Sequence, residues 1–308
     1  MDESAVTFLA EQFETHHDAM LVDRRAELLG RLKDVDALIV RNRTQVNAEI
    51  LTAAPNLKVV GRLGVGLDNI DMPACKARNV EVIPATGANA LAVAEYVIAT
   101  AMTLLRGAYF SSAAVGAGQW PRGPLSNGRE ISGKVLGIVG FGDIGRLVAR
   151  LAQGLGMRVV ASDPMIDTAA PVWKETGVSC RPLDALLAES DVISLHVPLV
   201  AETRNLINTA RLALMKTDAV LINSARGGIV DEAALATALR AKRLGGAALD
   251  VFDDEPLKAD SSLADCPNLV LTPHIAGVTA EANIRVSSMI AERVAAHLSS
   301  LREPSFAK

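Results

Sequence analysis

The chain has 308 residues, which is long for one compact core and sufficient for two domains of about 150 residues each. Its 31 lysine and arginine residues and 35 aspartate and glutamate residues form no long run of either sign. This excludes the charge pattern of nucleic-acid-binding or membrane-surface proteins and favours a small-molecule partner. The three cysteines lack disulfide or metal-ligand spacing and fit a reducing cytoplasm, and we expect no leader, membrane span or bound metal.

Strand-like and helix-like segments alternate along the chain. The first segment, MDESAVTFLAEQF, predicts a helix because Ala5, Phe8, Leu9 and Phe13 recur at helical spacing. Short apolar runs predict strands at 37–40, 58–61, 135–139, 157–162, 191–197, 218–223, 246–251 and 268–271. Helical patterns between them include 24–32, 144–155 and 232–241, the last with Asp231 as its N-cap. The alternation predicts an α/β fold with parallel sheets built from βαβ units.

The stretch VLGIVGFGDIGR at 135–146 places Gly140, Gly142 and Gly145 after a predicted strand and at the start of a predicted helix. This arrangement indicates a dinucleotide-binding loop, in which glycines allow a tight turn and a close approach to the pyrophosphate. Asp163 ends the next strand, where a carboxylate accepts hydrogen bonds from the ribose and repels a 2′-phosphate, so we expect NAD rather than NADP. The alternative is an ordinary glycine turn and an unrelated surface aspartate.

Three further polar residues follow predicted strands. Arg226 lies just before two glycines in NSARGG, Glu255 precedes Pro256, and His274 follows Pro273. Taken singly, they could be a surface charge, a solvated acid and a loop histidine. Together they supply a cation, a tuning carboxylate and a proton carrier, which hydride chemistry at a carboxylate-bearing alcohol requires.

The motifs in this order resemble those of the D-isomer-specific 2-hydroxyacid dehydrogenases, of the phosphoglycerate dehydrogenase-like kind. The resemblance covers nearly the whole chain and is carried by VGRLGVGLDNID (60–71), GFGDIG (140–145), HVPL (196–199), NSARGGIVDE (223–232), ALDVFDDEP (248–256) and TPHIAG (272–277). It implies two doubly wound parallel-sheet domains, with a Rossmann-type NAD-binding domain at 99–275 inserted into a discontinuous flavodoxin-like substrate domain at 1–98 and 276–308. It also implies a homodimer paired through the cofactor domain and the arm at 107–133, where Trp120 is either a contact residue or a buried anchor.

The resemblance also implies the roles of individual residues. Arg226 would bind the substrate carboxylate, His274 would exchange the proton of the hydroxyl group, and Glu255 would hydrogen-bond His274 and keep it a competent acid. The residues expected at the cofactor are Gly140, Gly142, Asp143, Ile144, Gly145, Asp163, His196, Val197, Pro198, Ser224, Ala225, Asp250 and Gly277. The backbone amides of Gly64, Val65 and Gly66 would bind the other side of the carboxylate.

Arg41 and Arg43 follow the strand at 37–40 with one residue between them, so in extended backbone both side chains leave on one face. They are either solvated charges or a second anion site, which would suit a phosphate or sulfonate. We therefore expect a substrate such as 3-phosphoglycerate or 3-sulfolactate. The alternatives are a glyoxylate or hydroxypyruvate reductase, a formate-type dehydrogenase and an NAD-sensing scaffold without turnover.

The two ends of the chain depart from the pattern of the family. Members normally begin with a strand inside the substrate-domain sheet, whereas this chain begins with the predicted helix; we expect a truncated or misassigned start, since a missing inner strand would leave apolar edges unpaired. The regulatory C-terminal domain of some phosphoglycerate-specific members is not expected within this chain.

Overall fold

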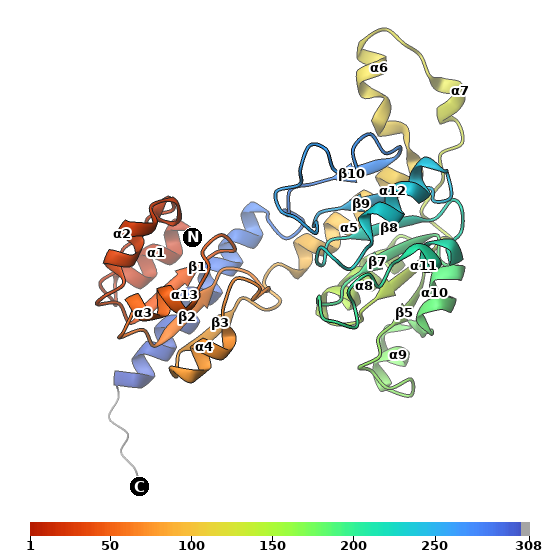
Figure 1. Ribbon diagram of the computed structural model, residues 1–308. Helices are drawn as coiled ribbons and strands as arrows, with labels where there is room; N and C mark the ends of the chain where they lie inside the picture. Colours follow the sequence, from red (N-terminus) through yellow and green to blue (C-terminus); the bar gives the residue numbers. More distant parts are fainter. Residues whose placement is uncertain (303–308) are drawn as a thin grey trace. The chain divides into compact units, whose positions relative to one another are not determined.

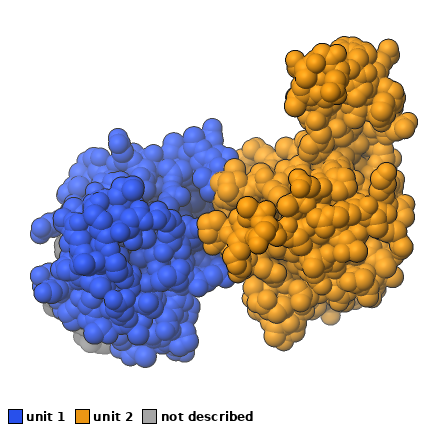
Figure 2. All heavy atoms as spheres, turned by 45° about the horizontal axis from the view of Figure 1, so that its top comes forward, with its two compact units in different colours: residues 1–89, 278–308 blue, residues 90–277 orange. Residues whose placement is uncertain are grey.

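The computed structural model describes residues 1–302 and divides into two compact units (Figure 2). Unit 1 comprises Met1–Asn89 and Val278–Lys308, and unit 2 comprises Ala90–Gly277. The chain therefore leaves unit 1, builds all of unit 2 and returns. The boundary expected after residue 98 falls inside helix α5 (Ala90–Arg106), whereas the units divide before this helix, which keeps its hydrogen-bonded backbone within one unit.

Unit 1 is built on a three-stranded parallel sheet in the order β1-β2-β3. The strands are β1 (Ala37–Val40), β2 (Val59–Arg62) and β3 (Glu81–Pro84). Helix α13 (Ala280–Arg302) packs on β2, where a Cβ at Gly61 would lie 2.7 Å from Ile290. The other helices of the unit are α1 (Glu3–Ala10), η1 (Leu21–Asp23), α2 (Arg25–Arg31), α3 (Ala48–Ala53) and α4 (Met72–Ala77).

The helix predicted at the start of the chain is confirmed as α1. Its buried residues Ala5 and Leu9 pack against Ala291 and Ala295 of α13. In the described sheet β1 pairs with β2 and β2 with β3, so β1 and β3 are its edge strands. The truncated or misassigned start that we expect stays a prediction.

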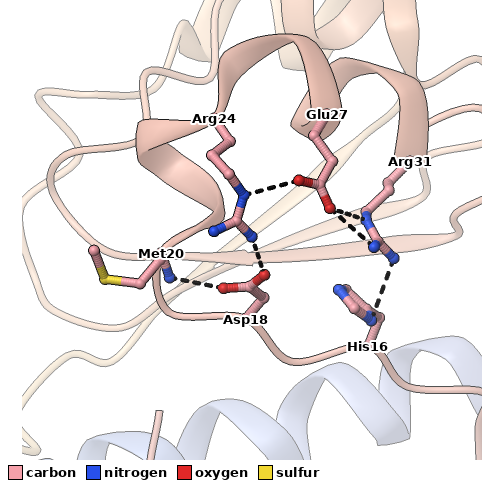
Figure 3. Close-up of polar contacts among 6 residues, drawn as sticks. All are labelled: His16, Asp18, Met20, Arg24, Glu27 and Arg31. Carbon is pink, nitrogen blue, oxygen red and sulfur yellow. Dashed lines mark hydrogen bonds and ion pairs between the residues drawn. The ribbon is translucent and has the colours of Figure 1, made fainter.

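A network of salt bridges and hydrogen bonds connects the loop between α1 and α2 to α2 (Figure 3). Arg24 donates to Glu27 at 2.8 Å and to Asp18, and Arg31 donates to the same Glu27 at 2.9 Å. These hydrogen bonds hold the pKa of the Glu27 carboxyl below its usual value. His16 lies 3.4 Å from Arg31. Because all of these groups face solvent, the network orders the loop but adds little to the free energy of unfolding.

Unit 2 contains a seven-stranded parallel sheet in the order β10-β9-β8-β7-β4-β5-β6. Figure 1 labels β10, β9, β8, β7 and β5 of this sheet. The strand order reverses at β4, which is the topology of a Rossmann sheet, so the predicted doubly wound parallel sheet is confirmed. The strands are β4 (Val135–Val139), β5 (Arg158–Ser162), β6 (Ser179–Cys180), β7 (Val192–Leu195), β8 (Val220–Asn223), β9 (Gly246–Leu249) and β10 (Leu269–Leu271).

Helices cover both faces of this sheet. Helices α5, α8 (Asp143–Gly154) and α9 (Pro171–Thr176) contribute to one core, and α10 (Leu183–Glu189), α11 (Thr209–Leu214) and α12 (Glu232–Arg240) contribute to the other. The N-cap predicted for α12 is confirmed, since the Asp231 side chain accepts the amide of Ala234 at 2.9 Å. Two cores on opposite faces explain why the strands are almost continuously apolar.

An arm extends from the rest of unit 2 after α5 (Figure 1). It contains η2 (Ala108–Ser111), α6 (Ser112–Gly116) and α7 (Arg122–Leu125). Trp120 on this arm is 79% exposed and Tyr109 is 65% exposed, so Trp120 is not a buried anchor within this chain. Among residues 1–302 no single helix could cross a membrane; α5 and the segment Ala108–Gly116 would together be long and apolar enough, but they bend by 67° at their break.

Candidate active site

The glycine-rich loop lies at the carboxyl end of β4, where the strand order reverses. Gly140 has φ +93°, and a Cβ there would come within 3.0 Å of the His196 carbonyl oxygen. A Cβ at Gly145 would collide in the same way with the carbonyl of Gly140. At Gly142, which caps α8, a Cβ would instead point into open space. Two of the glycines thus allow the tight turn, while the third leaves the start of the helix open to a ligand.

Asp163 follows β5 and reaches back to this loop. One carboxylate oxygen accepts the amide of Phe141 at 2.8 Å, and the other accepts the amide of Met165 at 2.9 Å. The carboxylate therefore fixes the shape of the glycine-rich loop in addition to any contact with a ribose, because each oxygen has further lone pairs. The sequence pattern suggested only the contact with the ribose.

His196 closes the other side of the loop at the end of β7. Its backbone amide donates to Val139 at 2.7 Å, and its Nε2 lies 2.9 Å from the hydroxyl of the buried Ser194. Burial of the ring lowers the pKa of His196 to about 4. A neutral ring supports the predicted role in shaping the pocket and does not suit a proton donor at neutral pH.

Arg226 lies in the turn after β8. The buried Asn223 shapes this turn, because its Nδ2 donates to the carbonyl of Arg226 at 2.8 Å and its Oδ1 accepts the amide of Ala225 at 3.1 Å. The next residue, Gly227, lies so close to the Phe252 carbonyl that a Cβ would overlap it. The turn that carries Arg226 is thereby held against the segment that leads to Glu255.

The residues around the glycine-rich loop fit a dinucleotide. The hydroxyl oxygen of Ser224 is buried and has no hydrogen-bond partner among the described residues, which is costly unless a ligand supplies one. Gly142 leaves the start of α8 open. The remaining predicted cofactor residues lie at the start of α8, after β7, after β8 and after β10: Asp143, Ile144, Val197, Pro198, Ala225 and Gly277. Their contacts with the cofactor stay predictions.

Glu255 and His274 form a direct pair. The Glu255 Oε2 lies 2.8 Å from the His274 Nδ1, and the Glu255 Oε1 accepts the amide of Phe252 at 3.2 Å. The two side chains are 35% and 42% exposed, so the pair faces the surface of unit 2. Because β8, β9 and β10 are neighbours, the residues that follow them, Arg226, Glu255 and His274, gather along the same edge of the sheet.

The loop at Gly64–Gly66 in unit 1 follows β2. The amide of Gly64 donates to the carbonyl of Arg62 at 2.8 Å, whereas no described residue accepts the amides of Val65 and Gly66. Of the three amides expected to bind a carboxylate, these two are therefore the ones left to do so. Asn69 holds this loop to the one after β1: it accepts from Arg62 at 3.2 Å and donates to the Arg41 carbonyl at 2.9 Å.

Arg41 and Arg43 do not lie as the extended backbone predicted. Strand β1 ends at Val40 and the chain bends over 42–44, so the alternation of a strand no longer applies. Arg43 forms an ion pair with Asp23, and Arg41 donates to Asn283 in α13. Both arginines are exposed, but the charge of Arg43 is balanced within unit 1.

Two features of the site were missed in the sequence. Thr272 and Tyr96 link Asp250 to the turn that carries His274, and Glu232 at the start of α12 accepts the amide of Asp253 at 2.8 Å. Burial raises the pKa of the Glu232 carboxyl. Thr272 belongs to TPHIAG and Glu232 to NSARGGIVDE, so both lay within the motifs, whereas Tyr96 on α5 carried no signal. Within residues 1–302, no cluster of histidine, cysteine and carboxylate residues is arranged to hold a metal ion.

Comparisons with known proteins agree with this geometry. Residues 98–276 match the family model of the D-isomer specific 2-hydroxyacid dehydrogenase, NAD binding domain. The chain is 52% identical to a (S)-sulfolactate dehydrogenase of Chromohalobacter salexigens, over 96% of this chain and 94% of that protein. It is 41% identical to a D-3-phosphoglycerate dehydrogenase of Archaeoglobus fulgidus, over 88% of this chain and only 51% of that longer protein.

Among solved structures, the D-lactate dehydrogenase of Aquifex aeolicus complexed with NAD and lactic acid superposes with a TM-score of 0.78. It is 32% identical, and the match covers 88% of this chain and 85% of that one.

Proposed function

This chain belongs to the D-isomer-specific 2-hydroxyacid dehydrogenases, NAD-dependent enzymes that act on CH–OH groups, and from that premise we propose that it interconverts 3-sulfolactate and its 2-keto acid. The observation that carries the catalytic part is the 2.8 Å contact between Glu255 and His274. The similarity to a sulfolactate dehydrogenase over nearly the full length of both chains supports the sulfonate.

The proton is moved by His274. In the reducing direction its Nε2 protonates the oxygen that becomes the hydroxyl group, and in oxidation it takes that proton back. Glu255 binds the opposite ring nitrogen, which fixes the ring orientation and stabilises the charged ring. The glycine-rich loop and Ser224 would hold NAD(H), which would supply the hydride in reduction and accept it in oxidation. A formate-type reaction has no use for this acid–base pair.

Arg226 binds and orients the substrate. A planar guanidinium suits a carboxylate and can also polarise the neighbouring carbonyl group. Asn223 and Gly227 hold the backbone of the Arg226 turn against the segment that leads to Glu255.

The second anion of the substrate is assigned to Arg41, with Arg43 in support. Arg41 has a neutral partner, Asn283, whereas Arg43 is balanced by Asp23. An arginine with a neutral partner retains its full charge for a sulfonate or phosphate. The stereochemistry is consistent: the CH2–sulfonate carbon outranks the carboxyl carbon in the priority rules, so (S)-sulfolactate has the arrangement about carbon 2 of a D-2-hydroxy acid.

Two catalytic variants test the roles in turnover. We expect His274→Gln and Arg226→Ala to lower kcat by about 100- to 10,000-fold, because general acid–base and charge contributions have that size. The affinity for NADH, measured by fluorescence titration, should change little. Turnover like that of the wild type in either variant would remove the role assigned to that residue, and a wild type that binds NADH without reducing any 2-keto acid would indicate a sensor.

Two arginine variants test the substrate. Arg41→Ala should raise the KM for sulfopyruvate by about tenfold or more and leave that for pyruvate nearly unchanged. Arg43→Ala should have a smaller effect, and the exposed Arg31→Ala serves as the control for loss of a surface charge. Equal effects of Arg41→Ala on the KM values for sulfopyruvate and pyruvate would show that Arg41 is a solvated surface charge and does not bind the second anion.

The arm of unit 2 supports the proposal of a homodimer. Tyr109, Phe110, Val115 and Trp120 expose apolar surface along one short segment, which is costly for a monomer in water. A second copy of the chain would cover it. Sedimentation should give twice the mass of one chain for the wild type, and Trp120→Asp should shift it toward the monomer; a wild-type monomer would contradict the proposal.

A further inference from the structure

His274 has an unusual backbone conformation. Its φ is +56°, in the left-handed region that a residue with a side chain avoids. The turn from Thr272 to Ala276 must therefore be held from outside, because an unsupported turn would relax to a conformation with negative φ and carry the imidazole elsewhere.

Asp250 provides most of this support from the end of β9. Asp250 is buried, with 1% of the residue exposed, and its carboxylate accepts three hydrogen bonds from the turn. The amide of Ile275 donates to Oδ1 at 2.8 Å, the amide of Ala276 donates to Oδ2 at 2.8 Å, and the hydroxyl of Thr272 donates to Oδ1 at 2.6 Å. The backbone carbonyl of Asp250 also accepts the amide of His274 at 2.8 Å.

Tyr96 on α5 completes the arrangement. Its hydroxyl lies 2.8 Å from Thr272 Oγ1. The Thr272 hydroxyl has one hydrogen and donates it to Asp250, so Tyr96 is the donor in its contact with Thr272. Burial and the nearby Asp250 carboxylate raise the pKa of Tyr96, so its hydroxyl keeps the proton that it donates. The direction of the chain is thus fixed from Tyr96 to Thr272 to Asp250.

We propose that Tyr96, Thr272 and Asp250 are positioning residues that lock the turn carrying His274. They act through His274, by holding its imidazole against Glu255. The resemblance implied for Asp250 only a contact with the cofactor, whereas three of its hydrogen bonds go to the turn. This inference rests on the proposed role of His274 as the acid and base.

Thr272→Val and Thr272→Ser test the proposal as a pair, because valine removes the hydroxyl at nearly constant volume and serine keeps it. We expect Thr272→Val to lower kcat about 10- to 100-fold, the range for loss of a hydrogen bond to a charged group, with little change in the KM for NADH. The base limb of the kcat profile for keto-acid reduction, which reports the protonated acid, should move to lower pH as the contact with Glu255 loosens. Thr272→Ser should restore both the rate and the profile.

The tyrosines give an independent test, since the chain has only Tyr96 and Tyr109. Tyr96→Phe should lower kcat about two- to tenfold and shift the base limb of the kcat profile to lower pH. This test remains available if Thr272→Val fails to fold. Tyr109→Phe, on the exposed arm, is the matched control and should change neither.

Three results would overturn the proposal. They are an unchanged pH profile in Thr272→Val and Tyr96→Phe, equal impairment in the valine and serine variants, and an equal effect of the two tyrosine variants. If His274→Gln retained turnover, the proposed function itself would fail. If that variant lost turnover while Thr272→Val and Tyr96→Phe behaved as wild type, only the positioning role would be wrong.

Discussion

The neutral His196 predicts a specific dependence of stability on pH. Burial lowers its pKa from 6.5 to about 4, so the folded chain disfavours the proton that the unfolded chain binds below 6.5. The unfolding free energy therefore keeps its full value above pH 6.5. It decreases as the pH falls from 6.5 toward 4, because the unfolded chain binds a proton at His196 that the folded chain does not bind. The full difference of about 2.5 pKa units corresponds to about 3 kcal/mol of unfolding free energy, of which about 2 kcal/mol is lost at about pH 5.

His196→Gln tests this value because glutamine does not titrate. The variant should be less stable than the wild type at about pH 7.5, and the difference between the two should shrink by about 2 kcal/mol at about pH 5. Unfolding can be followed by the fluorescence of Trp173, which is buried and stacks on Phe141 with ring centroids 5.0 Å apart. The control, His17→Gln, removes an exposed histidine and should follow the wild type at both pH values. A constant difference between wild type and His196→Gln would refute the reasoning.

Three further variants probe the cofactor loop and the acid–base pair. Gly140→Ala should lower the Tm of unit 2 and weaken NADH binding at least tenfold, because the new Cβ would collide with backbone atoms and the residue has φ +93°. The control Gly154→Ala should change neither, since a Cβ there meets open space, and equal effects of the two variants would contradict the close approach at Gly140. Asp163→Ser should weaken NADH binding more than it improves NADPH binding, because the backbone amide of Phe141 in the glycine-rich loop loses its acceptor. A complete switch of preference to NADPH in binding titrations would show that Asp163 does not hold this loop. Glu255→Gln should lower kcat about 100-fold in stopped-flow reduction at unchanged NADH affinity, and a wild-type rate would show that His274 works without it.

Much of the fold was predictable because local patterns and tertiary packing agree. The eight predicted strands correspond to β1, β2, β4, β5, β7, β8, β9 and β10. Strands β3 and β6 were not predicted, because neither gives a clear apolar run: β6 has only two residues, and β3 begins with the exposed Glu81 and ends in Pro84.

The site residues were predictable where a sequence motif fixes the backbone. The hydrogen-bond and ion-pair partners of exposed side chains were not, because several neighbouring groups could bind them. The glycine turn and the proximity of Glu255 to His274 depend on short segments at neighbouring strand ends. The partners of Arg41 and Arg43, in contrast, come from α13 and η1, which are far away in the sequence. No local pattern indicates that Asp23 balances Arg43.

The most direct test of the central claim is the specificity of the wild-type protein for 2-keto acids with NADH. Glyoxylate, pyruvate, hydroxypyruvate, phosphohydroxypyruvate and sulfopyruvate are compared by kcat/KM under one set of conditions. We expect sulfopyruvate to be reduced with a kcat/KM about 100-fold above that of pyruvate, because its second charged group gains a charge-assisted hydrogen bond. A preference for glyoxylate or pyruvate over both substrates with a second anion would contradict it.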